Sequence, residues 1–256
     1  MEYAVCVVPA AAIRNRASHK TEMINQLLFG EMMEILKIKK EEWYKIRSLH
    51  DKYEGYIRSN LVQVIDESEA KQVSPWVMTD LVNILETNND DMLISAGATL
   101  PDFADGEGRI GSIEYKYEGN FHHRNDIRPQ PEILQQLTGK WINAPYLWGG
   151  RTPLGVDCSG FVQVIFKMMG IDLWRDAYLQ KDQGIKINEL TSVQCGDLAF
   201  FTDHKKRIMH VGILLNENEI VHSSGNVRID TIDEEGITHS GSGVRTHKLI
   251  TIRRYW

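Results

Sequence analysis

Cysteine is scarce in this sequence, and long apolar runs and an excess of positive charge are missing. The three cysteines, Cys6, Cys158 and Cys195, are too few and too odd in number for a disulfide framework, so at least one thiol stays free. No apolar run approaches the ~20 residues that span a bilayer, which excludes a membrane-spanning role. A formal net charge of −6 argues against a protein that binds nucleic acid through a basic surface.

A secretory signal is also missing from the start of the chain, which reads MEYAVCVVPAAAI. Glu2 stands where a signal carries basic residues, and Pro9 interrupts a short apolar run. We therefore expect a cytoplasmic protein. The alternative is a protein of the cell envelope whose signal was removed.

Charge is unevenly distributed along the chain. The formal charge is +2 over residues 1–65, −8 over residues 66–125 and 0 over residues 126–256. The tetrapeptide Lys-Tyr-Glu-Gly at residues 52–55 recurs at residues 116–119, which is typical of duplicated structural units. We therefore expect three domains with these boundaries, the second related to the first.

Short β-rich pieces separated by charged turns fill the first segment. The pieces at 33–36, 43–46 and 55–57 predict closely spaced strands of a small barrel. The segment resembles bacterial SH3-like (SH3b) modules, whose usual features appear here as Ile13-Arg14-Asn15, Gly30-Glu31, Trp43-Tyr44-Lys45-Ile46 and Gly55-Tyr56-Ile57. The second segment lacks the Trp-Tyr-Lys element, and we expect there a divergent module of the same kind.

Cys158 follows a stretch rich in glycine that contains Pro153. Apolar residues then recur at helical spacing from Phe161 to Met169, until Gly170 ends the run. The pattern predicts Cys158 at the start of a buried helix. Free N–H groups and the helix dipole at that position are expected to lower the pKa of the thiol and to hold a developing oxyanion.

Two apolar strands that follow each contain one imidazole. His210 lies in the first, at 208–215, and His222 in the second, at 219–224, with a predicted hairpin turn at 216–218. Antiparallel neighbours of this kind bring the two side chains together, so that one histidine is the base and the other orients it.

Taken singly, these residues also suit plainer interpretations. An isolated cysteine near a helix start is more often structural, and a single histidine in an apolar strand is more often a satisfied core residue. A zinc site remains an alternative, although no paired Cys-x-x-Cys or His-x-x-x-His spacing supports it.

The joint pattern over residues 132–256 resembles the NlpC/p60 family of cell-wall peptidases, which are papain-like cysteine peptidases. The matching pieces, in the family's order, are Tyr146-x-Trp148-Gly149-Gly150, Asp157-Cys158-Ser159-Gly160-Phe161-Val162, Gly196-Asp197-Leu198, His210-Val211-Gly212-Ile213 and His222-Ser223-Ser224. The resemblance implies Cys158 as nucleophile, His210 as general base and His222 as the orienting residue. It also implies that the Tyr146 hydroxyl assists at the oxyanion.

Two SH3-like modules before such a domain resemble a subgroup of γ-D-glutamyl-L-diamino acid endopeptidases. The resemblance implies hydrolysis of the bond between γ-D-Glu and Lys or diaminopimelate in peptidoglycan stem peptides with a free N-terminal L-Ala, releasing L-Ala-γ-D-Glu. This activity belongs to muropeptide recycling or scavenging. In that subgroup the first module closes one end of the cleft.

A substrate with a free ammonium group needs carboxylates and acceptors, because an unpaired buried charge is costly. The candidate substrate contacts are Asp157, Ser159, Trp148, Asp176, Glu22 and Tyr53. Asp157 suits a helix cap as well as the ammonium group. Ser159 and, less directly, Arg175 are candidates for the α-carboxylate, and Asp176 for the diamino acid. Trp148 equally suits plain packing.

The fold class predicted from the sequence is α+β, with a papain-like domain after two small all-β SH3-like barrels. The expected protein is a monomeric thiol hydrolase that acts on a peptidoglycan-derived peptide, with no metal, cofactor, nucleic acid partner or membrane span. Two alternatives stay open: a cell-wall amidase or acyl transferase with the same Cys-His chemistry, and a non-catalytic protein that binds muropeptides.

Overall fold

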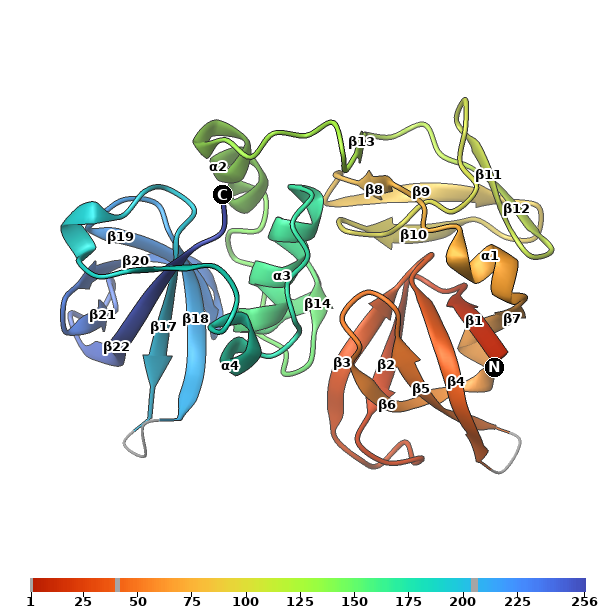
Figure 1. Ribbon diagram of the computed structural model, residues 1–256, viewed down its shortest axis with the longest axis horizontal. Coiled ribbons are helices and arrows are strands. Elements are labelled where there is room, and N and C mark those ends of the chain that lie inside the picture. The colour runs from red at the N-terminus through yellow and green to blue at the C-terminus, as the bar shows by residue number, and fades with distance from the viewer. Residues whose placement is uncertain (1, 40–41, 204–206) are drawn as a thin grey trace. The chain divides into compact units, whose positions relative to one another are not determined.

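The computed structural model describes residues 2–39, 42–203 and 207–256, which fold into two compact units. The N-terminal unit comprises Met1–Ile127 together with Trp148–Pro153, and the C-terminal unit comprises Arg128–Leu147 and Leu154–Trp256. The segment at 148–153, which lies shortly before Cys158 in the sequence, therefore packs with the first unit. Strands dominate both units, and helices are few (Figure 1).

The N-terminal unit begins with a curled antiparallel sheet whose strand order is β3-β2-β6-β5-β4-β1-β7. Its strands are β1 (Glu2–Cys6), β2 (Ala10–Arg14), β3 (Met23–Leu28), β4 (Met32–Lys39), β5 (Trp43–Ser48), β6 (Glu54–Arg58) and β7 (Val62–Ile65), with a 3₁₀ turn at Ser59–Leu61. The predicted strands at 33–36, 43–46 and 55–57 are thereby confirmed. Alternate side chains such as Ile13, Ile46 and Ile57 are fully buried in its core, as expected for a sheet with one solvated face.

The next stretch of the N-terminal unit is also mainly β-structure. Its elements are α1 (Glu67–Lys71), β8 (Trp76–Met78), β9 (Val82–Thr87), β10 (Met92–Ser95), β11 (Glu107–Ile110), β12 (Ile113–Lys116) and β13 (Phe121–His123). They form a four-stranded sheet, β10-β9-β12-β11, and a separate β13-β8 pair. The predicted second SH3-like barrel is therefore not confirmed.

The repeated tetrapeptide Lys-Tyr-Glu-Gly occupies different places relative to the strands of the two stretches. Residues 52–55 lead into β6, whereas residues 116–119 follow from the end of β12. Identical letters thus mark the start of one strand and the end of another, so the repeat alone does not confirm a second module.

The two stretches share a hydrophobic core, which makes them one unit. Phe29 and Ile65 of the first sheet pack in one cluster with Met78, Leu100 and Tyr115 of the second stretch. The backbones also meet directly, since the Thr99 N–H donates to the Phe29 carbonyl at 3.0 Å. Gly30 has φ +75°, and a Cβ there would lie 2.1 Å from the Thr99 carbonyl oxygen, so only glycine fits this approach.

The C-terminal unit contains the predicted helix-on-sheet arrangement. Its elements are α2 (Pro131–Gly139), β15 (Gly155–Val156), α3 (Cys158–Met168), α4 (Ala177–Gln180), β16 (Ile185–Ile187), β17 (Leu198–Thr202), β18 (Ile208–Leu214), β19 (Glu219–Ser224), β20 (Asn226–Asp233), β21 (Gly236–Thr238) and β22 (Arg245–Arg254), with a 3₁₀ turn at Leu190–Ser192; β14 (Arg151–Thr152) belongs to the N-terminal unit. The sheet order is β16-β22-β17-β18-β19-β20-β21. Because β21 also pairs with β22, six of the strands close into a barrel.

Helix α3 is buried along its whole length and packs against β18 and β19 (Figure 1). A separate apolar cluster that includes Phe201, Leu214 and Ile220 supports the same sheet. This packing places the start of α3 against the two strands that carry His210 and His222. Across the described residues, no helix combines the length and the apolar character needed to cross a membrane.

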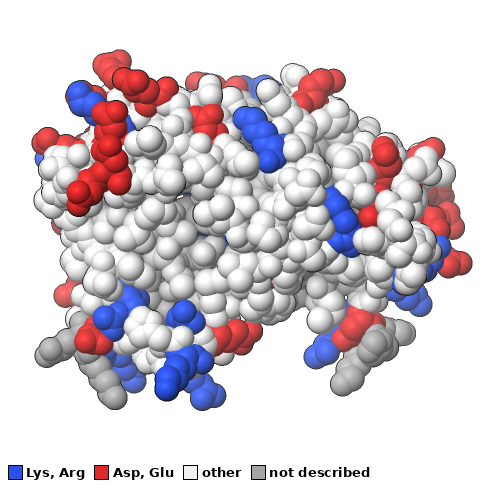
Figure 2. All heavy atoms as spheres, turned by 180° about the vertical axis from the view of Figure 1, so that it is seen from behind, with Lys and Arg blue, Asp and Glu red and all other residues white. Residues whose placement is uncertain are grey.

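Basic and acidic side chains are interspersed on the face shown in Figure 2. On the first sheet of the N-terminal unit, Lys45 and Arg47 both pair with Glu54, at 2.9 and 2.7 Å. The Glu54 carboxylate thus pairs with two neighbouring basic side chains of this sheet.

Candidate active site

Helix α3 begins at Cys158, as the sequence predicts. Asp157 is its N-cap: the backbone is extended, and the carboxylate accepts a hydrogen bond from the Gly160 N–H at 2.7 Å. The Cys158 side chain is 7% exposed, and the backbone of Val211 on β18 hydrogen-bonds the thiol. Val211 directly follows His210, so the thiol lies beside the strand that carries the expected base.

The start of α3 acts on the thiol as expected, because the Ser159 backbone hydrogen bond lowers the pKa of Cys158, but burial outweighs this effect. Burial, and then the negative charge of Asp157, raise the pKa of the Cys158 thiol to about 12. The hydrogen bond from Val211 and the charge of Arg175 act in the opposite direction but do not outweigh burial. Cys158 is therefore a neutral thiol at pH 7, and as the predicted nucleophile it would need a base.

Asp157 is held by a buried arginine. Arg175 Nη1 and Nη2 donate to the two oxygens of the Asp157 carboxylate at 3.0 and 2.6 Å, and Nη1 also donates to Ser159 Oγ at 2.8 Å. Arg175 is 1% exposed and Asp157 5%. The carboxylate beside the nucleophile is thus neutralised and fixed, and the Ser159 hydroxyl belongs to the same cluster.

The two histidines meet as the strand pattern predicts. His210 Nε2 lies 2.7 Å from His222 Nδ1, and both side chains are buried. Strands β18 and β19 pair with Ile213 opposite Val221, a register that brings Gly212 next to His222. A Cβ on Gly212 would lie 2.9 Å from the His222 Cβ, so the glycine of the His-Val-Gly motif makes room for the second histidine.

Two further residues of the C-terminal unit contact this pair, and sequence reasoning missed both. Asp230 Oδ2 lies 3.0 Å from His222 Nε2, and Arg228 Nε donates to the same oxygen at 2.8 Å. The sequence motifs assign no role to either residue. The alternation of β20 was the available signal, because it puts Arg228 and Asp230 on one face.

His247 on β22 lies beside His210, the predicted base. Its ring stacks on the His210 ring, with centroids 4.2 Å apart and an interplanar angle of 26°. Burial first, and then the charges of His222, His247 and Arg228, hold the pKa of His210 well below its usual value. His210 is therefore neutral at pH 7 and able to accept a proton.

Tyr146, the predicted oxyanion donor, lies in the same unit as Cys158. Its backbone N–H donates to the Gly225 carbonyl at 2.9 Å, which ties it to the turn between β19 and β20. Burial raises the pKa of the Tyr146 hydroxyl, and the nearby charges of Cys158 and Asp157 raise it further. The hydroxyl thus stays protonated and available as a donor.

The remaining predicted contacts are divided between the units. Asp176 precedes α4 and hydrogen-bonds the exposed Tyr178. Glu22, Tyr53 and Trp148 belong to the N-terminal unit, whereas Cys158 belongs to the C-terminal unit.

Within the N-terminal unit, Glu22 and Trp148 come from adjacent stretches. A Cβ on Gly149 would lie 2.8 Å from the Met23 carbonyl oxygen, so the residue after Trp148 packs against the residue after Glu22. Glu22 accepts a hydrogen bond from Asn15 at 3.1 Å, and Trp148 is 56% exposed.

Arg151 anchors this segment. Its Nη1 and Nη2 donate to the two carboxylate oxygens of Glu31 at 2.7 and 2.9 Å, and Nη1 also donates to the Gln26 carbonyl at 2.8 Å. Arg151 and Glu31 are 0% and 3% exposed. Glu31 of the Gly-Glu motif therefore holds the segment that leads to the nucleophile.

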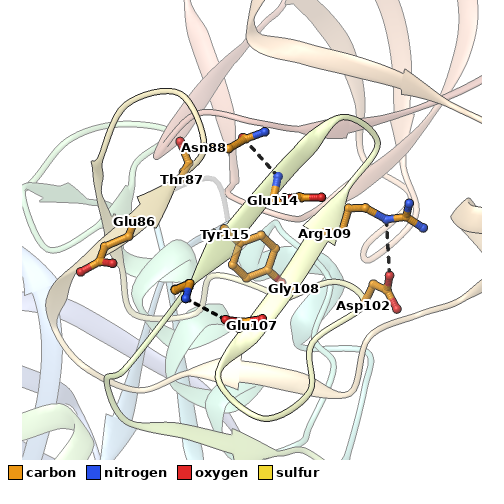
Figure 3. Close-up of a pocket in the computed structure, with 10 residues that line it drawn as sticks. Glu86, Thr87, Asn88, Asp102, Glu107, Gly108, Arg109, Glu114 and Tyr115 are labelled. Atoms are coloured by element: carbon orange, nitrogen blue, oxygen red, sulfur yellow. Dashed lines mark hydrogen bonds and ion pairs between the residues drawn. The ribbon is translucent and has the colours of Figure 1, made fainter.

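A pocket of about 520 Å³ lies elsewhere, over β9, β11 and β12 of the N-terminal unit (Figure 3). Its charged side chains pair with one another: Lys116 lies 2.8 Å from Glu107, and Arg109 lies 3.8 Å from Asp102. No cysteine or histidine lines it, so it does not offer the chemistry of the Cys158 site.

Over residues 2–39, 42–203 and 207–256, no group of three or more His, Cys, Asp or Glu side chains is arranged to hold a metal ion. The expectation of a site without metal or cofactor stays a prediction.

Two models of known protein families match separate segments of the chain. A model of the NlpC/P60 family matches residues 143–246, and a model described as the bacterial dipeptidyl-peptidase Sh3 domain matches residues 13–60. The first match covers the cysteine and both histidines, and the second covers most of the first sheet.

Three curated relatives share this sequence to different extents. Dipeptidyl-peptidase 6 of Lysinibacillus sphaericus is 26% identical over 84% of this chain and 86% of that protein. The probable endopeptidase NlpC homolog of Haemophilus influenzae is 33% identical over 50% of this chain and 72% of that protein. The gamma-D-glutamyl-L-lysine dipeptidyl-peptidase of Bacillus cereus is 30% identical over 52% of this chain but only 41% of that protein.

The fold has a counterpart among solved structures. The crystal structure of an NlpC/P60 family protein from Bacillus cereus superimposes with a TM-score of 0.83 at 21% identity, over 99% of each chain. The likeness extends across both units and includes the stretch at 66–125.

Proposed function

The chain belongs to the NlpC/P60 family and is a peptidase, and from this premise we propose what it cleaves. The proposed substrate is a peptidoglycan stem peptide with a free N-terminal L-Ala. The bond cleaved joins γ-D-Glu to an L-diamino acid, Lys or diaminopimelate, and the product is L-Ala-γ-D-Glu.

The observation that carries the proposed chemistry is the 2.7 Å contact between His210 Nε2 and His222 Nδ1, beside the start of α3. With Nε2 engaged by His222, the other ring nitrogen of His210 is left for the thiol of Cys158. A neutral thiol and a neutral imidazole form a competent pair, because the base removes the proton as the sulfur attacks.

Acylation follows from these positions. The Cys158 sulfur attacks the γ-carbonyl carbon of D-Glu while His210 takes the thiol proton. The oxyanion that forms is stabilised by N–H groups at the start of α3 and by the Tyr146 hydroxyl. His210 then gives its proton to the amine of the diamino acid, the amide bond breaks, and a thioester to Cys158 remains.

Deacylation reverses the proton movements. His210 takes a proton from a water molecule, and the hydroxide attacks the thioester carbonyl. The C–S bond breaks, the thiol of Cys158 recovers a proton from His210, and L-Ala-γ-D-Glu leaves as the free acid.

The proposed substrate rests on the relatives and on the candidate contacts. Two relatives are named for dipeptidyl-peptidase activity, and one of these for the γ-D-glutamyl-L-lysine bond. Within the C-terminal unit, we assign the ammonium group of L-Ala to Asp157 and the diamino acid to Asp176. Glu22 and Tyr53 stay candidates predicted from the sequence. Ser159 is a further proposed binding residue of this unit, and Trp148 stays a candidate predicted from the sequence.

The test is incubation with L-Ala-γ-D-Glu-L-Lys and with the same peptide acetylated on the L-Ala amine, followed by mass spectrometry. We expect L-Ala-γ-D-Glu from the free peptide, at least tenfold slower release from the acetylated one, and no release by Cys158→Ala. Equal rates on both peptides would contradict the free-amine requirement. Products joined to a new acceptor would show acyl transfer instead of hydrolysis.

A further inference from the structure

The hydrogen-bonded chain that starts at His210 continues past His222 to a buried carboxylate. His222 Nε2 lies 3.0 Å from Asp230 Oδ2, and the two side chains are 0% and 1% exposed. We infer that Asp230 is a positioning residue that fixes the tautomers of His222 and His210, so that the base presents a lone pair to Cys158. This inference rests on the proposed use of His210 as base.

The sheet places the three side chains on one face. Strands β19 and β20 pair with His222 opposite Arg228, and Asp230 is two residues further along β20, at the diagonal position. Diagonal neighbours on one face are within reach of long side chains. Asp230 therefore reaches His222 from one side, while His210 on β18 reaches it from the other.

Asp230 is built to stay ionised. Its Oδ2 also accepts from Arg228 Nε at 2.8 Å, and its Oδ1 accepts from the Ser240 backbone N–H at 2.9 Å. Burial alone would raise the pKa of this carboxyl, but the hydrogen bonds from His222, Ser240 and Arg228 outweigh it and hold the pKa far below its usual value. An ionised carboxylate only accepts hydrogen bonds.

The tautomers follow step by step from that constraint. Facing an acceptor, His222 carries its proton on Nε2. Burial lowers the pKa of His222, so the ring is neutral at pH 7 and its Nδ1 is an acceptor. His210 must then donate from Nε2 to His222 Nδ1, which leaves His210 Nδ1 unprotonated. When that nitrogen takes the proton of Cys158, the charge is shared along a chain that ends at Asp230.

An amide at position 230 would reverse the chain. Asn has the shape of Asp, but in the orientation that puts its NH₂ group in the place of Oδ2 it donates to His222 Nε2, and Arg228 Nε must turn away from it. His222 would then carry its proton on Nδ1 and donate to His210 Nε2, and His210 would hold its own proton on Nδ1, where the base must be free. In serine peptidases the corresponding Asp-to-Asn change lowers kcat about 10⁴-fold by trapping the wrong tautomer.

The first test compares Asp230→Asn with Asp233→Asn in kcat and KM on L-Ala-γ-D-Glu-L-Lys. Asp233 lies on the same strand and pairs at the surface with Arg245, so it controls for loss of a charge from β20. We expect kcat to fall at least 100-fold in Asp230→Asn with KM within about threefold, and both to stay unchanged in Asp233→Asn. A kcat within twofold of wild type for Asp230→Asn would overturn the inference.

The second test needs no substrate, so it separates this inference from the proposed function. Long-range ¹H–¹⁵N spectra of the imidazoles at pH 8 report which nitrogen carries the proton. We expect protonated Nε2 on both His210 and His222 in wild type and in Asp233→Asn, and protonated Nδ1 on both in Asp230→Asn. Protonated Nδ1 on His222 in the wild type would refute the inference even if the peptide is cleaved.

Discussion

Arg175 Nη2 donates to Asp157 Oδ2 at 2.6 Å, in a fork that is shielded from water one residue before the nucleophile. The pair caps α3, orients Ser159 and sets the charge next to Cys158. Removing one member of a buried pair leaves the other charge unpaired, whereas removing both charges leaves no such penalty.

Arg175→Met should therefore destabilise the C-terminal unit by about 3–5 kcal/mol. The double variant Arg175→Met/Asp157→Asn should recover a large part of that loss, because neither charge of the pair is then left without its partner. Urea denaturation gives the four free energies of unfolding for a double-mutant cycle. If the losses of the single variants simply add in the double variant, the pair is not coupled.

Tyr146→Phe tests the oxyanion assignment. Losing one preformed donor to the oxyanion should lower kcat by about 10²–10³ with little change in KM or stability. Tyr255→Phe is the matched control, since its hydroxyl donates to the Gln180 carbonyl at 2.7 Å and has no assigned role in the reaction. Equal kcat values in both variants would remove Tyr146 from the proposed mechanism.

Glu31→Gln tests the anchor of the 148–153 segment. It leaves the Arg151 guanidinium buried without its carboxylate, which should cost about 3–5 kcal/mol in the free energy of unfolding. Glu34→Gln is the control, because Glu34 pairs with the partly exposed Arg47 at 3.3 Å and should cost less than about 1 kcal/mol. If urea titrations give the same midpoint for both variants, the buried Arg151–Glu31 pair contributes no more to the free energy of unfolding than the exposed Arg47–Glu34 pair.

Stability should fall as the pH is lowered from about 6.5 toward 4. Burial, with the charges of His222 and Arg228, lowers the pKa of His247 to about 4, whereas an unfolded histidine binds its proton near 6.5. Over that interval the unfolded chain binds more protons than the folded chain, so the free energy of unfolding rises with pH. Buried His210 and His222 act in the same direction.

Thermal denaturation across that pH interval checks this, with His247→Phe for comparison. The aromatic ring keeps the stacking on His210 but cannot titrate, so the slope of the melting temperature against pH should be smaller. An unchanged slope would show that His247 does not contribute to the pH dependence.

The sequence was sufficient to predict the elements that bear the chemistry. Helix α3 and strands β18 and β19 follow directly from apolar periodicity. One cysteine and two histidines interrupt the apolar pattern, and the packing of the helix on the two strands brings these elements together. Gly212 gives this pattern a physical reason, since a side chain there would displace His222.

What the sequence could not predict depends on register and burial. Asp230 is one of two acidic residues in β20, and only the pairing of β20 with β19 shows that it faces His222. The pKa of Cys158 was predicted in the wrong direction because the helix start is visible in sequence, whereas the degree of burial is not. Likewise, the sequence of the repeated tetrapeptide does not show that one copy leads into β6 and the other follows from the end of β12.

The most direct test of the account is to trap the covalent intermediate. Intact-mass analysis of the enzyme, quenched in acid during turnover of L-Ala-γ-D-Glu-L-Lys, should show an L-Ala-γ-D-Glu acyl adduct that peptide mapping places on Cys158. The adduct should be absent from Cys158→Ala and from unreacted enzyme. Turnover by Cys158→Ala at the wild-type rate, or an adduct on Cys6 or Cys195 instead, would contradict the assignment of Cys158 as the nucleophile.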